Sequence, residues 1–224
     1  MTGATGAFDK GSHIVKRRLT ALALVLLATA CSRDGEITES GVYVTRSICP
    51  QVGIPAATGD ITLFSPSNRT DAAALDVSAA MTNVRSTCDD SGANVVSTVT
   101  FDVVATRRDA AEARTVVLPY FTVAMQGGSD VVAKKLGNVG LNFAAGSIRA
   151  QTTGQATIQV SRSVATLPED ARRELTRKRK ASDPNAAIDP LSDPKIRDAV
   201  ARATFEHLVG FQLTQEQLRY NATR

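Results

Sequence analysis

The pattern of apolar and polar residues divides the chain into three parts. Between residues 61 and 164, apolar side chains recur at every second position, which is the period of a β-strand with one buried face. After residue 165 the spacing becomes that of an amphipathic helix. Before residue 31 there is one short apolar run behind a basic flank. The three patterns predict three different kinds of structure.

The central part predicts a series of strands separated by turns. In the longest one, residues 94–108, one face consists of alternate and mostly apolar residues: Val95, Ser97, Val99, Phe101, Val103 and Ala105. Further strands are expected at residues 74–81, 115–125, 131–143 and 154–164, and the glycine-rich stretch 126–130 predicts a hairpin turn. Because no helical segment separates these strands, we expect a mainly β fold, either an antiparallel β-sandwich of Ig-like architecture or a small barrel, followed by a helical C-terminal tail.

One expected strand, residues 115–125, contains a proline. Pro119 has no backbone N–H to donate to a neighbouring strand, so we expect it at a sheet edge or at a bulge. The side of the strand that holds it is apolar throughout: Val117, Phe121, Val123 and Met125.

The tail is expected to begin with a basic helix. Pro168, followed by the acidic residues Glu169 and Asp170, suits a helix N-terminus, and the helix would end in the basic run 177–180. Three Asp-Pro pairs follow, and because proline disfavours a helical conformation at the residue before it, they predict a linker.

A second helix is expected after the linker. Asp193 and Pro194 suit its N-cap and first residue, and Gly210 suits its C-terminal cap. Its apolar stripe follows helical spacing: Ile196, Ala199, Val200, Ala203 and His207. Thr214 and Gln217 have the spacing of a capping box and predict one more short helix at the end of the chain.

The N-terminal part has the features of a secretion signal. Lys16, Arg17 and Arg18 precede an apolar run from Leu19 to Ala30, which is too short to cross a bilayer. A basic flank, an apolar run of this length and small residues at its end together predict a signal peptide.

The end of this run, LATAC at residues 27–31, resembles the lipobox of bacterial lipoproteins. In that family the cysteine is lipidated and becomes the N-terminus, so the resemblance implies a lipid on Cys31 and removal of residues 1–30. Leu27 lies one position further from the cysteine than the family prefers. In the same family an Asp directly after the cysteine favours retention in the inner membrane, so Ser32 at that position implies, by the resemblance, an outer-membrane anchor with the body of the protein in the periplasm.

The expected organisation follows from these boundaries. It comprises an N-terminal extension and signal peptide (1–30), a lipidated tether (31–48), a β-sandwich domain (49–165), a basic helix (166–182), an Asp-Pro linker (183–193) and C-terminal helices (194–224).

Two cysteines remain once Cys31 is assigned to lipidation. Cys49 and Cys88 form an even pair in an exported chain, which predicts a disulfide. The alternative is a pair of metal ligands, but no histidine accompanies them, and we expect no metal and no cofactor. His207 is the only histidine after residue 30, which excludes any site that needs two.

The charge of the chain depends on whether the signal is removed. Lys and Arg number 26 against 22 Asp and Glu, a formal charge of +4. Residues 1–30 carry four bases and one acid, so the remainder has 22 against 21, or +1. Nucleic acid is therefore not an expected partner. Tryptophan is absent and tyrosine is rare, which argues against an aromatic platform for sugars or bases.

The expected basic helix contains a concentrated run of basic residues. Residues 172–180 contain six basic side chains and one acidic one. The basic residues, candidates for contact with an anionic lipid surface or an acidic envelope partner, are Arg172, Arg173, Arg177, Lys178, Arg179 and Lys180. The alternative is a solvated helix end, at which positive charge is favourable.

A second resemblance covers residues 41–165. CPQVG, a cysteine in RSTCDD, and LPYFTVAMQGGSDVVAKK are similar to a group of Gram-negative lipoproteins of unassigned function. This resemblance implies an envelope lipoprotein with a β domain and no particular activity.

Function is expected to lie in interaction rather than catalysis. No serine lies in a Gly-x-Ser-x-Gly elbow, and the one histidine is expected to be committed to packing. We expect a non-catalytic interaction or assembly module that is anchored to the outer membrane and contacts an envelope protein. The alternative is a carrier of a lipid or small hydrophobic ligand, in which residues 54–60 and the tail form a lid. An apolar pocket would favour the carrier. A bare sheet edge would favour the interaction module, and polar groups that converge on His207 would favour an enzyme.

Overall fold

The computed structural model describes residues 36–38, 41–43, 47–177, 182, 184–185 and 187–223. The chain forms two compact units, Met1–Thr45 and Arg46–Arg224. In the first unit, β1 (Glu36–Thr38) pairs antiparallel with β2 (Gly41–Tyr43). All the other described elements belong to the second unit.

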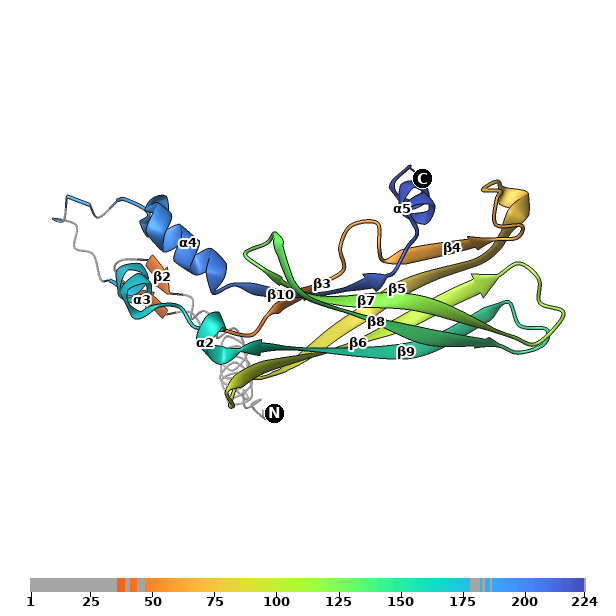
Figure 1. Ribbon diagram of the computed structural model, residues 1–224, viewed down its shortest axis with the longest axis horizontal. Helices are drawn as coiled ribbons and strands as arrows, with labels where there is room; N and C mark the ends of the chain where they lie inside the picture. Colours follow the sequence, from red (N-terminus) through yellow and green to blue (C-terminus); the bar gives the residue numbers. More distant parts are fainter. Residues whose placement is uncertain are drawn as a thin grey trace, which may run out of the picture. The chain divides into compact units, whose positions relative to one another are not determined.

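The second unit contains two four-stranded sheets (Figure 1). In spatial order, the first sheet comprises β3 (Gln51–Gly53), β10 (Phe205–Phe211), β7 (Arg114–Gln126) and β8 (Asp130–Phe143). The second comprises β4 (Asp60–Phe64), β5 (Leu75–Asp89), β6 (Asn94–Arg107) and β9 (Arg149–Ser161). All pairings are antiparallel except that of β3 with β10. The mainly β fold predicted from the period-two pattern is confirmed.

The two sheets share one core. Side chains of both sheets, such as Phe101 of β6 and Leu118 of β7, are fully buried in the same cluster. The expected inner face of residues 94–108 is confirmed along its whole length. Gly154 of β9 lies against the Phe101 ring, and a Cβ at this position would overlap it. The alternation along β6 therefore decides which side of the second sheet is buried.

Short helices follow the last strand of the second sheet. They are α2 (Arg162–Ala165), α3 (Glu169–Thr176), α4 (Pro194–Arg202) and α5 (Gln215–Thr223), with a single 3-10 turn at Pro190–Ser192 before α4. Another 3-10 turn, Ala72–Ala74, lies between β4 and β5. The Asp193 side chain accepts from the backbone N of Lys195, which confirms the expected N-cap.

The capping box at the last helix is also confirmed. The backbone N of Gln217 donates to Thr214 Oγ1 over 3.2 Å, and the backbone N of Thr214 donates to Gln217 Oε1 over 2.9 Å. These reciprocal contacts satisfy backbone groups that the start of α5 would otherwise leave unpaired.

The helix predicted through His207 is wrong beyond Arg202. Residues 205–211 form β10, which inserts between β3 and β7 in the first sheet. The stripe at Ile196 and Ala199 belongs to α4, whereas Phe205, His207, Val209 and Phe211 alternate and are all buried. Gly210 is not a helix cap. It lies within β10, where a Cβ would overlap the Thr58 side chain.

Pro119 does not lie in an edge strand, because β7 is between β10 and β8. The Pro119 carbonyl accepts from the backbone N of Gln212, directly after the end of β10, over 2.9 Å. A strand residue directs its N–H and C=O to the same side, so the missing N–H of Pro119 faces this end and not β8. The bulge of this hairpin lies further along, between Ala124 and Met125.

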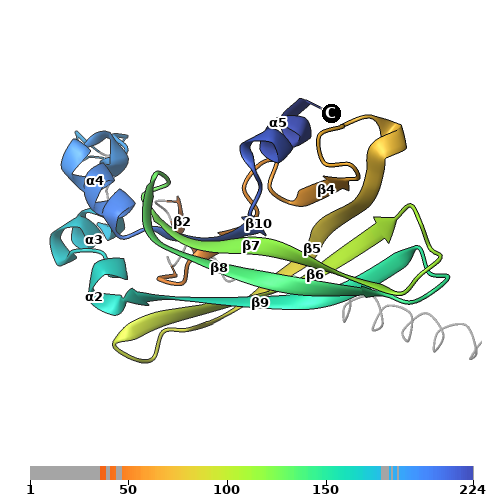
Figure 2. The ribbon, with the colours of Figure 1, turned by 45° about the vertical axis from the view of Figure 1, so that its right-hand side comes forward.

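The last helix lies against β4 and the loop before it. Asn221 of α5 donates from Nδ2 to the backbone oxygens of Ala57 and Asp60, at 2.9 and 2.7 Å. The Phe64 and Tyr220 rings meet edge to face with centroids 5.2 Å apart. Figure 2 shows α5 lying over β4. These contacts hold the last helix against the second sheet.

Candidate functional site

The most concentrated polar chemistry of the described residues is inside the sandwich. His207 of β10 lies between two hydroxyls, with Nδ1 2.9 Å from Ser97 Oγ and Nε2 2.7 Å from Thr122 Oγ1. The three residues come from three strands and are buried: His207 is 0% exposed, Ser97 1% and Thr122 5%. Together they separate the main core cluster from a second one around Val95 and Phe205.

This buried trio holds a neutral histidine. Burial lowers the pKa of His207 to about 4, because the charged ring would lose its hydration. A neutral imidazole has one N–H and one lone pair, so one hydroxyl accepts from the ring and the other donates to it. Although a serine beside a histidine is also the geometry of an activated nucleophile, a substrate has no path to a fully buried pair. The arrangement therefore acts as a satisfied polar layer in the core.

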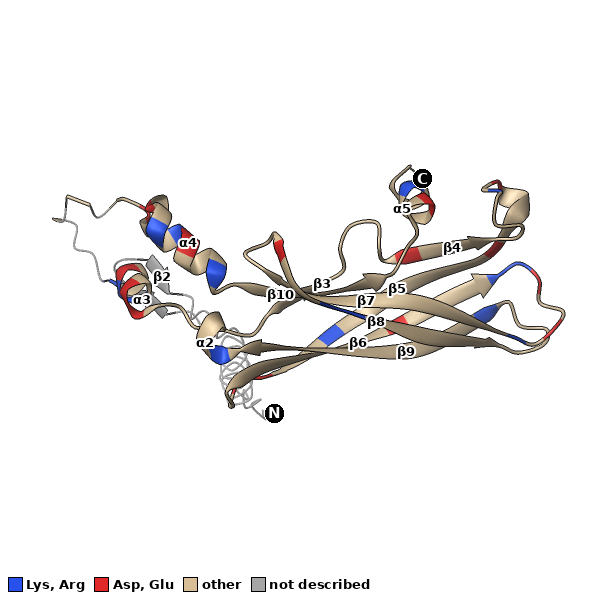
Figure 3. Ribbon diagram, viewed as in Figure 1, with Lys and Arg blue, Asp and Glu red and all other residues tan. Residues whose placement is uncertain are grey.

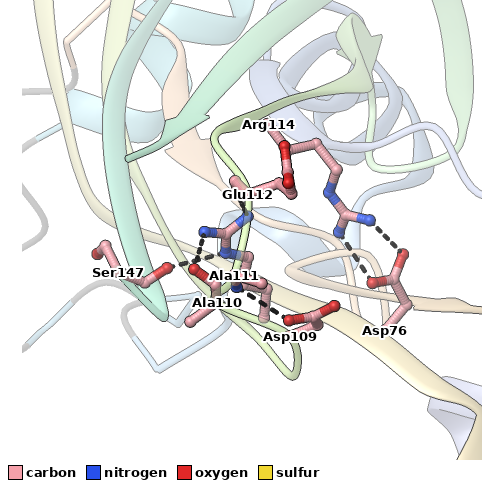
Figure 4. A network of polar contacts seen from close by, with 8 residues as sticks. Asp76, Asp109, Ala110, Ala111, Glu112, Arg114 and Ser147 are labelled. Atoms are coloured by element: carbon pink, nitrogen blue, oxygen red, sulfur yellow. Dashed lines mark hydrogen bonds and ion pairs between the residues drawn. The ribbon is translucent and has the colours of Figure 1, made fainter. Parts of the chain in front are cut away.

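A second buried polar group, Arg107, ties together the two loops that connect the sheets at one end. It donates only to backbone carbonyls, those of Ser147 at 2.8 Å, Glu112 at 2.6 Å, Ala144 at 2.9 Å and Ala110 at 3.2 Å. Three of these residues, Ser147, Glu112 and Ala110, are labelled in Figure 4. Its guanidinium also lies 5.1 Å from the centre of the Phe143 ring. Sequence reasoning missed this residue, although Arg107 continues the inward-facing alternation of β6 beyond Ala105.

The surface carries an apolar strand at the end of the first sheet. Among the described residues, β8 pairs only with β7, and residues 131–136 are exposed without exception. We call this segment the β8 edge. Its apolar side chains are exposed by half or more: Val131 by 58%, Val132 by 50% and Leu136 by 67%. Val117 of the neighbouring strand is 59% exposed.

The apolar side of β7 contributes to the same surface. The side that holds Val117 and Phe121 is the outer one, because the opposite residues Leu118 and Thr122 contact the interior. The ammonium of Lys134 lies 5.3 Å from the centre of the Phe121 ring. On this side of β7, Val117 is thus exposed, Phe121 is half-buried beneath the ammonium of Lys134, and Val123 is buried.

The second sheet has a depression on its outer face, with a volume of about 620 Å³. It is lined by three neighbouring residues on each of three strands, 78–80 of β5, 104–106 of β6 and 149–151 of β9. Its apolar lining consists of four alanines and Val104, the rest is polar, and no large apolar side chain such as Phe is among them. Such a lining differs from the apolar pocket that a carrier of a hydrophobic ligand requires.

The expected disulfide is confirmed. Cys49 and Cys88 are bonded, with their Cα atoms 6.1 Å apart, and join the segment before β3 to the end of β5. Among the described residues, no three His, Cys, Asp or Glu side chains are grouped to hold a metal. No helix in the described ranges is long and apolar enough to cross a membrane.

The basic residues expected at one surface are partly described. On α3, Arg172 forms an ion pair with Glu169, and just after the helix Arg177 pairs with Glu174 at 3.1 Å, while Arg173 is exposed. Lys178, Arg179 and Lys180 lie outside the described residues, as does Cys31. Figure 3 shows charge concentrated on α3 and α4 and sparse along the long strands.

Comparison with known proteins assigns this chain to no family. A scan against protein-family models, a search of curated proteins and a search of solved structures each return no match.

Proposed function

We propose that the protein is a lipid-anchored component of the Gram-negative envelope whose β-sandwich is a non-catalytic interaction or assembly module. Cys31 supplies the anchor to the outer membrane, and the body faces the periplasm. The observation that carries the proposal is the β8 edge, where Val131, Val132 and Leu136 are exposed on a strand whose outer side pairs with no strand of the described residues.

An uncovered edge of this kind favours association with other extended chains. An exposed strand presents backbone N–H and C=O groups to any other extended chain, and apolar side chains add to its tendency to associate. Contiguous exposed apolar residues on a soluble domain mark interaction surfaces more often than isolated ones do. The neighbouring Val117 and the half-buried Phe121 extend the apolar surface beyond the strand itself.

The other two functions have weaker support. Catalysis would require access to His207, which is fully buried. Carriage of a lipid would require an enclosed cavity with large apolar side chains, whereas the depression on the second sheet is lined by alanines, Val104 and polar residues and opens outward. The described part of the basic helix has two of its arginines in ion pairs, so its contribution to an anionic contact rests on Arg173 and the run that follows.

The proposal is tested by site-specific crosslinking in intact cells. A photoreactive phenylalanine analogue in place of Leu136 should give a discrete crosslinked product, and the same analogue in place of Gln159, exposed on the second sheet, should not. Adding Val132→Asp should remove the product without loss of folding, because Val132 is on the surface. Equal crosslinking at both positions, or none at Leu136, would contradict the interaction surface.

A further inference from the structure

We infer that the β8 edge takes an added β-strand from a partner protein, and that this strand carries two adjacent carboxylates opposite Lys134 and Lys135. The inference rests on the proposed interaction function and specifies the chemistry of its partner.

The backbone of the edge is available for pairing. Beyond the ladder with β7, residues 131–136 make no backbone hydrogen bond to any described part of the chain. Alternate residues of a strand direct N–H and C=O to opposite sides, so the side away from β7 presents unpaired donors and acceptors. An extended segment laid along it gains main-chain hydrogen bonds, as in recognition by strand addition.

The register limits where the new strand fits. Val131 is opposite Met125 and Ala133 is opposite Ala124, so Val132 is the extra residue of a bulge at the end nearest the turn. Bulges interrupt regular pairing. Regular pairing therefore starts at Ala133 and runs through Lys134, Lys135 and Leu136.

The two lysines lie on opposite faces of the sheet. They are consecutive and pair with Val123 and Thr122 without an irregularity, so their side chains alternate. Lys134 is on the outer face with Phe121, and Lys135 is on the other. A partner strand thus meets one positive charge on each face, and two adjacent acidic residues satisfy both.

The charge around the edge favours an acidic partner over a second copy of this chain. The charged residues of β7 and β8 are Arg114, Asp130, Lys134 and Lys135, and Arg114 is already paired with Asp76. Two copies paired about the centre of this segment would place lysine against lysine, which is unfavourable directly across strands. The lysines therefore both repel self-pairing and select a partner with carboxylates.

The test uses synthetic peptides against the full chain purified from host cells. The probe is a blocked decapeptide of alternating Thr and Val with Glu-Glu at its centre, and its matched forms carry Gln-Gln or Lys-Lys there. We expect the Glu-Glu peptide to bind about three- to tenfold more tightly than the Gln-Gln peptide, as two exposed ion pairs allow, and the difference to shrink in high salt. N-methylation of alternate peptide amides should abolish binding.

Charge reversal supplies the matched control. Lys134→Glu with Lys135→Glu should invert the preference toward the Lys-Lys peptide, whereas Lys195→Glu with Arg197→Glu, the same change of charge on α4, should leave it unaltered. All four side chains are exposed, so both variants should melt as the parent does. Hydrogen exchange should slow at residues 133–136 when the peptide is bound.

The outcomes separate this inference from the proposed function. If no peptide binds while crosslinking at Leu136 persists, strand addition is wrong and the interaction surface stands. Equal binding of all three peptides would overturn the acidic partner. A concentration-dependent dimer that Leu136→Asp abolishes would assign the edge to a second copy instead.

Discussion

His207 and Ser97 are 110 residues apart in the chain, and their side chains meet 2.9 Å apart in the interior of the sandwich. The contact joins β10, an inner strand of the first sheet, to β6, an inner strand of the second. Thr122 satisfies the other ring nitrogen, and because burial would strip the charged ring of its hydration, the histidine is held in its neutral form.

We expect the protein to lose stability between pH 6.5 and pH 4. The pKa of His207 is about 4 in the folded protein and 6.5 when unfolded, so the unfolded chain binds the proton first as the pH falls. The stabilisation is complete above the unfolded pKa and disappears toward the folded one, a change of about 3 kcal/mol at most. Urea unfolding at pH 7 and pH 4.5 measures it.

The matched variant for this prediction is His207→Gln, which keeps polar atoms but cannot titrate. It should be less stable than the parent at pH 7 and should lose much less stability between the two pH values. Three surface carboxyls also have lowered pKa values through hydrogen bonds, those of Asp71, Asp89 and Asp102. Their contribution is lost only at lower pH, as the carboxyls protonate. A pH dependence that is the same in parent and variant would contradict the assignment to His207.

Removal of the Cys49–Cys88 disulfide should destabilise the fold. The bond closes a loop with a sequence separation of 39 residues, and the chain-entropy model assigns about 4 kcal/mol to such a loop. The Cys49→Ala, Cys88→Ala double variant should therefore unfold at a lower urea concentration than the parent, and a reducing agent should lower the midpoint of the parent but not of the variant. Free reaction of both thiols with a maleimide in the native parent would show that the bond is not formed.

Arg107→Met should cost about 2–4 kcal/mol of unfolding free energy. The substitution removes the guanidinium donors to the carbonyls of Ser147 and Glu112, which stay partly buried, whereas the carbonyls of Ala110 and Ala144 keep the backbone N–H groups of Gly146 and Ser147. Arg107→Lys should recover only part of this loss, because a single ammonium cannot reach carbonyls spread around a planar guanidinium. Arg149→Met, at an exposed position, is the control and should change the free energy by less than about 0.5 kcal/mol. Equal effects at both positions would argue against a structural role for Arg107.

Cys31→Ser should release the protein from the membrane. The prediction follows from the short apolar run that ends in LATAC. We expect either uncleaved precursor or a protein that no longer sediments with outer membranes, as judged by mass spectrometry and fractionation. Unchanged mass and unchanged fractionation would contradict lipidation at this residue.

Replacement of Arg177, Lys178, Arg179 and Lys180 by Gln should weaken binding to anionic vesicles by several orders of magnitude, if each contributes about 1 kcal/mol. Helix α3 should persist, because it ends at Thr176 and Gln supports a helix about as well as Arg or Lys. Sedimentation with vesicles at low and high salt measures the effect. If variant and parent bind alike at both salts, the run is a solvated helix end.

The sequence alone determined those features that depend on local pattern. Alternation predicted the buried face of β6, Asp193 and the Thr214–Gln217 pair predicted helix starts, and the even cysteines predicted the disulfide. Each of these signals is contained within a few residues or in a count, so no knowledge of the neighbours in space was needed.

Only the tertiary structure decided the features that depend on which elements face one another. Both sides of β7 are largely apolar, and the side that holds Val117 became the outer one because the opposite side meets the second sheet. The spacing of apolar residues in 205–211 fits both a helix and a strand. They form a strand because their backbone pairs with β3 on one side and β7 on the other, while alternate side chains enter the core. His207 and Arg107 are buried for the same reason: their polar atoms find partners on strands and loops distant in the chain, and without those partners burial would be too costly.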